Sequence, residues 1–443
     1  MTIFWTTEHV NALAPDAASL KSGRALAVAS KWQTLGQADG ILWGEIKGSG
    51  STPYRTAIEQ ATPSFKCSCP SRKFPCKHGL GLALVYTAQP DALTQTEFPD
   101  WVAEWVNKRV QKQAAKASTE PVDEATLKKR EKAQEKRREA RSDKVSTGVA
   151  ELQTWLYDQV RQGLSQSVMD SRAWDKMAAR MIDAQAPALA RRLQRCAEAR
   201  FSGDAWQEKL LSEVAYLHLL LAAYSRREEL SPDLQADIAA YIGETTNKTD
   251  LLEQAGVIDN WLVVGQAIEE QDAMRIQRTW LIGTQQTRYA LLLDFAVANQ
   301  AMTLRPPVGS VINAELVFYA GSWASRALLK QDNGAVSVTP DLSAFMSIPA
   351  IFQAFQTQLA LSPWLSQYPC AVNAVIPVRH NEQWLLVDRD LMTLPLKIPD
   401  SKGWHLLAFS GGHPVSVFGE WNGETLLPLT VFNEQLGGSV ERL

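Results

Sequence analysis

FKCSCPSRKFPCKHGL, residues 65–80, places four potential metal ligands within a short stretch: Cys67, Cys69, Cys76 and His78. Thiolate sulfur and imidazole nitrogen are donors with which proteins close a tetrahedral shell around Zn²⁺. Three of the five cysteines and one of the six histidines of the chain lie in this stretch, which argues against a chance grouping. A shell of four protein ligands leaves no position for a catalytic water, so the pattern predicts one structural zinc ion.

The segments around this stretch predict a small α/β module over residues 1–110. Residues 41–47 and 54–59 predict two strands joined by the Gly/Ser-rich tip 48–51, and residues 78–87 predict a helix directly after the ligands. The ligand stretch therefore lies between a hairpin and a helix, and the helix's positive end favours the thiolate of Cys76.

Two further helices are expected in the same module. One spans Ala17–Trp32, with apolar residues at helical spacing. The other spans residues 101–110. Trp101 and Trp105 lie one helical turn apart on the second helix, and we expect them to pack on the core of the module.

The C-x-C-x6-C-x-H pattern resembles the SWIM zinc finger, a ββα module, and the order of hairpin, ligands and helix matches it. The wider region with its LWGEIKGSGSTPYRTAIE run (residues 42–59) is similar to a family of uncharacterised bacterial SWIM proteins. The resemblance implies binding of DNA or of a protein partner. Bacterial members often occur beside MoxR-type AAA ATPases and von Willebrand A-domain proteins, which implies an adaptor or substrate-recognition role with such partners.

Basic side chains surround the predicted zinc site: Lys66, Arg72, Lys73 and Lys77. The sequence has no acidic residue between Glu59 and Asp91, and residues 108–144 carry 13 Lys/Arg against 7 Asp/Glu. Nucleic acid is therefore expected to bind in the first third of the chain, through salt-sensitive phosphate contacts. Phe74 is a candidate for stacking on a base. The alternatives are a protein-binding finger and a finger that is purely structural.

The rest of the chain divides by pattern. Residues 111–146 are rich in charge and lack aromatic residues, which predicts a linker that is either disordered or a solvated helix. Residues 147–258 predict a helical domain. Its clearest helix carries a stripe of large apolar residues at steps of three and four: Trp206, Leu210, Val214, Leu217, Leu221 and Tyr224.

Residues 259–443 predict a β-rich domain, either a curled sheet or a small barrel, interrupted by a helix over Leu342–Leu361. Asn422-Gly423 predicts a two-residue hairpin turn of type I′. The fold class is thus α+β with several domains. The expected strands are Trp261–Gln266, Ile276–Ile282, Tyr289–Val297, Ile312–Tyr319, Ala371–Val378, Trp384–Asp388, His405–Phe409, Val415–Trp421 and Glu424–Val431.

Composition excludes several classes of protein. The start of the chain has no secretory signal pattern, no apolar run is long enough to span a membrane, and the cysteines do not form a disulfide framework. We therefore expect a cytoplasmic protein. The common nucleotide-binding, hydrolase and metalloprotease motifs are absent from the sequence, which favours a non-enzymatic adaptor. The alternative is a hydrolase or nuclease with a site in the C-terminal half.

Overall fold

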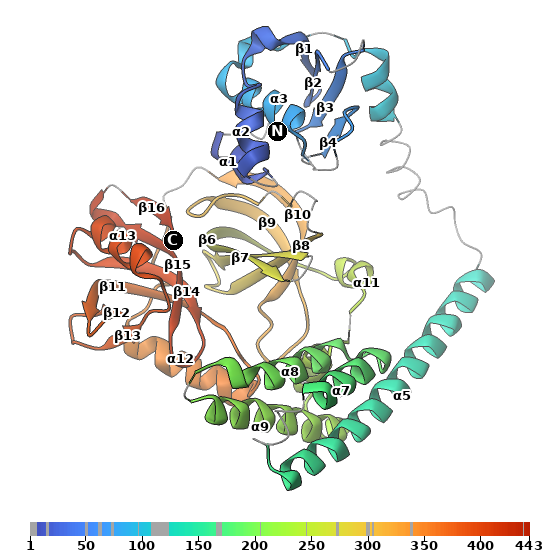
Figure 1. The fold of residues 1–443 in the computed structure, drawn as a ribbon, viewed down its shortest axis with the longest axis vertical. Helices are drawn as coiled ribbons and strands as arrows, with labels where there is room; N and C mark the ends of the chain where they lie inside the picture. Colours follow the sequence, from blue (N-terminus) through green and yellow to red (C-terminus); the bar gives the residue numbers. More distant parts are fainter. Residues whose placement is uncertain are drawn as a thin grey trace.

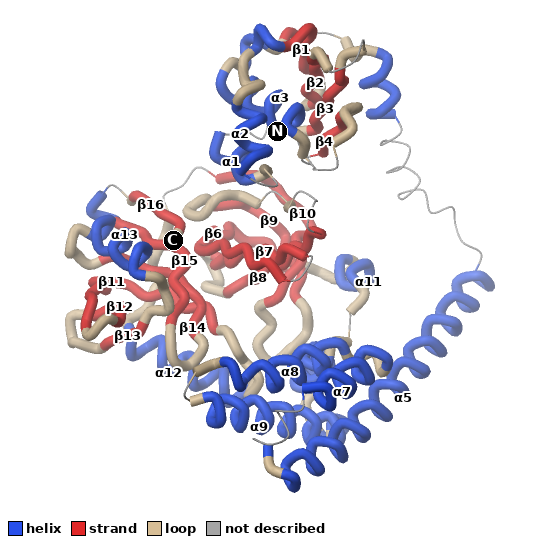
Figure 2. Tube along the Cα trace, in the orientation of Figure 1, coloured by secondary structure: helices blue, strands red, loops and turns tan. Residues whose placement is uncertain are grey.

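The computed structural model contains a small N-terminal α/β module, a helical bundle, a closed β-barrel and a second β-sheet (Figures 1 and 2). This architecture confirms the prediction of an α+β protein with a helical middle and a β-rich C-terminal part. Over the described residues, no helix combines the length and apolar character that crossing a membrane requires. The structure describes residues 7–14, 17–48, 52–60, 64–71, 75–95, 97–107, 124–164, 171–203, 205–244, 246–271, 274–297, 302–303, 305–336, 340–436 and 438–443.

The N-terminal module is built on a sheet with the strand order β4-β3-β2-β1-β5. The two predicted strands are confirmed as β2 and β3, whereas β1, β4 and β5 were not predicted. The tip 49–51 lies outside the described residues. The elements are α1 (Thr7–Ala12), α2 (Ala17–Arg24), η1 (Ala29–Lys31), β1 (Trp32–Ala38), β2 (Ile41–Ile46), β3 (Tyr54–Glu59), β4 (Ser64–Cys67), α3 (Lys77–Ala88), η2 (Pro90–Ala92), β5 (Thr94–Gln95) and a helix over 100–107.

Both faces of this sheet are covered. Leu42 and Ile58 point to the face on which α3 packs, where they join Leu80 in one buried cluster. Trp43 faces the other side and packs in a second buried cluster with Val102 of the helix over 100–107. The prediction that Trp101 and Trp105 pack on the core is confirmed, because both rings contact this second cluster.

The predicted helix Ala17–Trp32 is wrong beyond its first half, because α2 ends at Arg24. Trp32 instead begins β1, pairs with Ile46 of β2 and is buried. Its indole N–H donates to the carbonyl oxygen of Leu26, 2.9 Å away, which fixes the connection between helix and strand. Pairing with a neighbouring strand therefore overrides the local helical pattern.

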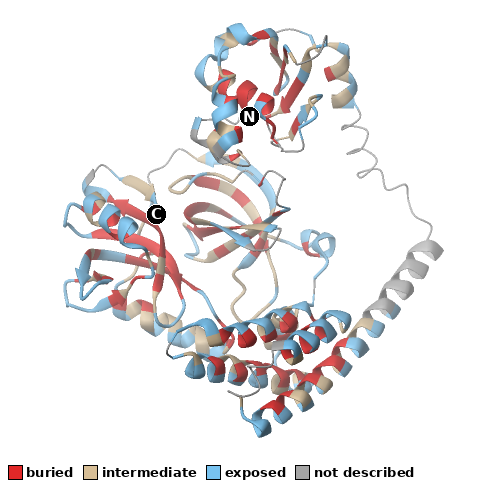
Figure 3. Cartoon of the chain, in the orientation of Figure 1, coloured by how far each residue is buried: buried red, intermediate tan, exposed pale blue. Residues whose placement is uncertain are grey.

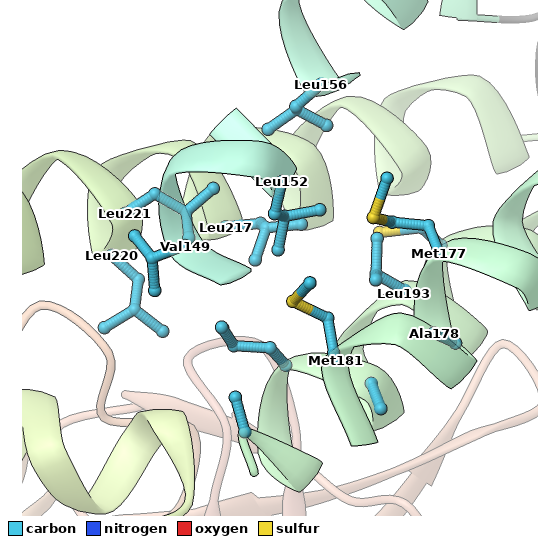
Figure 4. Packing of buried hydrophobic residues seen from close by; sticks show 14 of the residues in the cluster. Val149, Leu152, Leu156, Met177, Ala178, Met181, Leu193, Leu217, Leu220 and Leu221 are labelled. Atoms are coloured by element: carbon cyan, nitrogen blue, oxygen red, sulfur yellow. The ribbon is translucent and has the colours of Figure 1, made fainter. Parts of the chain in front are cut away.

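The middle of the chain is a helical bundle with one buried core (Figure 4). The predicted stripe is confirmed: α9 buries Leu210, Val214, Leu217, Leu221 and Tyr224, while Trp206 packs against the same core in a partly buried position. The elements are α5 (Glu124–Gln162), α7 (Ser171–Asp183), α8 (Pro187–Glu198), η3 (Ala199–Phe201), α9 (Trp206–Ser225), η4 (Arg227–Glu229), α10 (Pro232–Ile242) and α11 (Lys248–Leu252).

Helix α5 crosses residue 146, where the sequence placed the end of the linker. Its second half contributes Val145, Val149, Leu152 and Leu156 to the bundle core. Residues 124–146 are therefore part of a helix, and residues 111–123 of the predicted linker lie outside the described residues.

The β-rich part contains a closed barrel, with the order β10-β8-β7-β6-β9, and a sheet with the order β13-β12-β11-β14-β15-β16. β10, β13 and β16 were not predicted. The elements are β6 (Val257–Gln271), β7 (Met274–Gly283), β8 (Tyr289–Val297), β9 (Val311–Phe318), β10 (Arg326–Val336), α12 (Ile348–Leu361), β11 (Tyr368–His380), β12 (Gln383–Val387), β13 (Thr393–Pro395), α13 (Asp400–Ser410), β14 (Val415–Trp421), β15 (Leu426–Asn433), η5 (Glu434–Leu436) and β16 (Ser439–Arg442).

Barrel and sheet pack face to face, which explains their continuous apolar runs. Trp261 and Val263 of β6 point into the barrel, whereas Leu262 and Val264 point outward against the sheet. All seven residues of β14 are buried, since α12 and α13 cover its other face (Figure 3). Strands buried on both faces lose the alternating pattern.

A buried ion pair joins the barrel to the sheet. Arg278 of β7 donates to both carboxylate oxygens of Glu420, at 2.9 and 3.0 Å, and the indole N–H of Trp280 donates to the same carboxylate at 2.8 Å. The Glu420 side chain is 1% exposed. These donors therefore stabilise a carboxylate charge that would otherwise be buried in the interface without a hydrogen-bond partner.

Two predicted elements in this part need correction. Residues His405–Phe409 belong to helix α13, not to a strand: Gly403, Leu406 and Ser410 are buried at helical spacing. The helix expected over Leu342–Leu361 begins only at Ile348.

The hairpin between β14 and β15 is confirmed, but its turn differs from the prediction. Trp421 pairs with Leu426, so the loop has four residues rather than two. The side chain of Asn422 accepts the backbone N–H groups of Glu424 and Thr425, at 2.9 and 2.7 Å, and stabilises this longer loop. Gly423 has a φ of 100°.

Candidate metal centre

The four predicted ligands come from both ends of one loop. Cys67 is the last residue of β4, and Cys69 follows in the turn after it. Cys76 is the residue immediately before α3, and His78 lies in the first turn of that helix. Pairing of Cys67 with Thr56 of β3 holds β4 in the sheet, so the strand and the start of α3 converge on one point.

The donor atoms meet closely enough to bind one ion. One ligand atom from each of the four residues lies within 4.8 Å of the other three. The Nδ1 atom of His78 is 3.7 Å from the sulfur of Cys67 and 3.9 Å from that of Cys76. A tetrahedron with usual Zn–S and Zn–N bond lengths has edges of about 3.5–4 Å, so the donor set fits zinc.

Burial and hydrogen bonding shift the pKa values of the three thiols. The hydrogen bond from Cys67 lowers the pKa of Cys76, and His78 and the backbone N–H of Gly79 lower it further. The same hydrogen bond, together with burial, raises the pKa of Cys67. Burial also raises the pKa of Cys69. Without metal the cluster therefore keeps protons that zinc must displace, which links metal binding to proton release.

Residues around the ligands orient them. The hydroxyl oxygen of Thr56 lies 3.2 Å from the sulfur of Cys67, and the ring of Tyr54 packs at 5.0 Å from the imidazole of His78. Both residues lie on β3, the strand next to β4. Contacts from residues around the ligands set the orientation of the ligand side chains and the affinity of the site for the metal. Neither contact was predicted from the sequence: the pairing of β3 with β4 places Thr56 beside Cys67, and the packing of α3 on the sheet brings His78 to Tyr54.

Gly79 permits the close approach of α3 to β4. A Cβ atom at this position would lie 2.9 Å from Cδ1 of Phe65, a buried residue of β4. Because His78 directly precedes Gly79 and Cys67 lies two residues after Phe65, a larger side chain at Gly79 would push apart the two ends of the ligand set.

We expect Gly79→Ala to weaken zinc binding about ten-fold, since overpacking typically costs about 1–3 kcal/mol and 1.4 kcal/mol corresponds to a factor of ten. Competition against a colorimetric chelator measures this. Lys77→Ala, an exposed position in the same helical turn, should leave the zinc affinity unchanged. Equal affinities for Gly79→Ala and the unsubstituted protein would show that the approach of α3 to β4 does not control the site.

The predicted binding residues are only partly described. Lys66 on β4 and Lys77 at the start of α3 are exposed, and each is the direct neighbour of a ligand. Arg72, Lys73 and Phe74 lie outside the described residues.

Comparison with known proteins identifies two regions. Residues 66–86 match the model of the SWIM zinc finger, and residues 140–242 match that of the SWIM-associated four-helix bundle domain. No curated protein and no solved structure gives a significant match to the chain. The chain thus combines a SWIM zinc finger, which contains one Cys3His zinc site, with the helical bundle associated with this finger.

Proposed function

We propose that this chain is a zinc-stabilised, non-enzymatic binding protein whose SWIM finger contacts DNA. The observation that carries the proposal is the exposure of Lys66 and Lys77 directly beside the zinc ligands. The surrounding sequence from Gln60 to Pro90 contains no acidic residue that would oppose a phosphate.

The positions of the two lysines suit phosphate contacts. Lys77 lies in the first turn of α3, where backbone N–H groups and the helix dipole favour an anion. Lys66 lies on β4, one residue before Cys67. In this proposal, zinc fixes the spacing between Lys66 and Lys77. The fixed spacing limits the entropy lost when the two lysines bind phosphate groups. Arg72, Lys73 and Phe74 remain candidates from the sequence and lie outside the described residues.

We expect the double variant Lys66→Ala/Lys77→Ala to bind duplex DNA more weakly and with less salt dependence. Each lost phosphate contact reduces the slope of log K against log salt by about 0.9, so two contacts reduce it by about 1.8. Fluorescence anisotropy with a labelled duplex, titrated between about 50 and 200 mM salt, measures the slope.

The matched control is Lys21→Ala/Lys31→Ala, which removes two exposed lysines of the same module and the same total charge. This control should keep most of the affinity. If both double variants lose equal affinity, the effect is one of net charge. If neither changes the slope, the finger does not contact DNA through these lysines.

A second candidate function is that of a protein adaptor. Exposed apolar side chains gather on two adjacent bundle helices: Tyr157 and Val160 of α5 are 45% and 50% exposed, and Leu211 and Leu219 of α9 are 60% and 46% exposed. The ring of Tyr157 lies 5.7 Å from that of His218, which connects the two helix surfaces. An apolar surface of this kind favours a protein partner.

A partner such as a MoxR-type AAA ATPase or a von Willebrand A-domain protein, as the resemblance implies, would engage this surface. Such a partner would co-purify equally with the unsubstituted protein and with Lys66→Ala/Lys77→Ala. That outcome, combined with an unchanged slope of log K for DNA binding against log salt, would favour the adaptor function over the DNA-binding function.

A further inference from the structure

A cavity of about 180 Å³ lies where the helical bundle meets the β-rich part. Helix α10 forms one wall, and strands β7 and β8 of the barrel form another. The remaining walls are the β9–β10 loop and the segment 362–367 that follows α12. The side chains that matter for its chemistry are Asp237, Tyr241, Trp280, Trp323, Ser325 and Ser362.

Asp237 is the one formally charged side chain among the described residues that line this cavity. Its Oδ2 atom is shielded from solvent and has no hydrogen-bond partner in the described part of the chain. Burial raises the pKa of Asp237, although hydrogen bonds from Ser322 and Ser362 act in the opposite direction. A carboxylate oxygen that is shielded from solvent without a partner is costly unless the group is protonated or a cation lies beside it.

Among the described residues of the bundle, no basic side chain pairs with Asp237. Arg192, which acts electrostatically on the neighbouring Tyr241, has its guanidinium 3.5 Å from Glu213. Asp233, one turn before Asp237 on α10, adds negative charge instead. Asp237 and Asp233 therefore place negative charge at the α10 wall of the cavity.

Aromatic rings complete the cavity. Trp323 stacks on Tyr368 with a centroid distance of 5.3 Å, and its ring lies 6.5 Å from that of Trp280, in a nearly parallel orientation. The indole N–H of Trp280 donates to Glu420, so its ring is fixed by the ion pair between barrel and sheet. Contacts made outside the cavity hold both rings in place, which preorganises the site.

We infer that this cavity binds a methylated ammonium group, with Asp237 as its counter-charge and Trp280, Trp323 and Tyr241 as its aromatic wall. A quaternary ammonium spreads its charge over methyl groups that pack well on aromatic rings, and it needs no hydrogen-bond acceptors beyond a nearby carboxylate. The bound group would contact bundle and barrel together, so it would also stabilise their packing. This site is separate from the zinc finger and does not depend on DNA binding.

The test is calorimetric titration of the full chain with choline chloride and, separately, with its uncharged carbon analogue 3,3-dimethyl-1-butanol. We expect choline to bind, and the neutral analogue to bind at least ten-fold more weakly, because it lacks the charge that Asp237 and the rings attract. A peptide containing trimethyl-lysine is the third probe. If the peptide binds and choline does not, the ammonium comes from a partner protein rather than from a free metabolite.

Asp237→Asn keeps the shape of the side chain and removes its charge, so choline binding should weaken at least ten-fold. Asp183→Asn is the matched control: this exposed carboxylate at the end of α7 does not line the cavity, and its variant should bind choline like the unsubstituted protein. Trp323→Leu should also lose binding, and it keeps the inference testable if Asp237→Asn is unstable in thermal unfolding. Equal binding of choline and its neutral analogue, undiminished binding by Asp237→Asn, or no binding of choline and the peptide at tens of millimolar would overturn the inference.

Discussion

Cys76→Ala will abolish stoichiometric zinc binding and loosen the ligand loop between β4 and α3. Structural zinc contributes about 10–16 kcal/mol of apparent binding free energy in small fingers, which is as large as the whole stability of a typical domain. Cys76 is buried and lies within 3.9 Å of the His78 nitrogen, so no neighbouring side chain can replace its sulfur without a rearrangement. The expected result is loss of zinc and rapid amide exchange over residues 64–80.

Elemental analysis and hydrogen exchange check this result. The matched control is Cys196→Ala, since Cys196 is a buried cysteine of the bundle that lies outside the site. The control should retain one zinc per chain. Removal of metal from the unsubstituted protein by a chelator should reproduce the exchange pattern of Cys76→Ala. Full zinc content in Cys76→Ala, or unchanged exchange after metal removal, would contradict the assignment.

Loss of the metal should affect the ligand loop more than the rest of the N-terminal module. Helix α3, which follows the ligand loop, supplies Leu80, Leu82 and Val85 to the main buried cluster of the module. Zinc therefore joins the loop to an existing core. We expect β2 and β3 to exchange more slowly than the loop after metal removal, because their central residues Leu42 and Ile58 stay packed on α3.

Trp364→Ala will destabilise the helical bundle by about 3–5 kcal/mol, although the residue lies more than 120 positions beyond the end of α10. Its side chain is 2% exposed and belongs to the buried cluster of the bundle. It contacts Tyr241 of α10 with a centroid distance of 6.0 Å. Truncation to alanine removes a large buried ring and leaves a cavity between the bundle and the β-rich part.

Hydrogen exchange over α9 and α10 measures this effect without requiring a single unfolding transition of a multidomain chain. Trp404→Ala is the control: Trp404 is 52% exposed on α13 and packs against Trp384, away from the bundle cluster. Its substitution should leave exchange in α9 and α10 unchanged. If the bundle exchanges equally in both variants, Trp364 is not part of its core.

Trp364 also shows how the bundle and the β-rich part depend on each other. The sequence divides the chain at residues 258 and 259, where helical spacing gives way to strands. In the structure, Trp364 inserts into the bundle core, and Asp237 of α10 lies at the cavity shared with the barrel. A fragment that ends at residue 258 would lose this ring, so the bundle core is complete only together with the β-rich part.

Features that depend on neighbouring residues were predictable from the sequence. The zinc ligands are confined to residues 67–78, and the chemistry of sulfur and imidazole donors identifies their metal without knowledge of the fold. The stripe on α9 repeats at helical spacing, and β2 and β3 alternate or run as short apolar segments. In each of these cases the local pattern and the final environment agree.

Features decided by distant contacts were not predictable in this way. Trp32 joins a strand because Ile46 pairs with it, and residues 405–409 form a helix because Leu406 packs beneath the sheet. The positions of Thr56 beside Cys67 and of Trp364 inside the bundle follow from strand pairing and from packing between parts of the chain. Local sequence specifies the donor set and the strong periodic elements, whereas tertiary contacts decide the ambiguous segments, because burial free energy exceeds the small differences in local propensity.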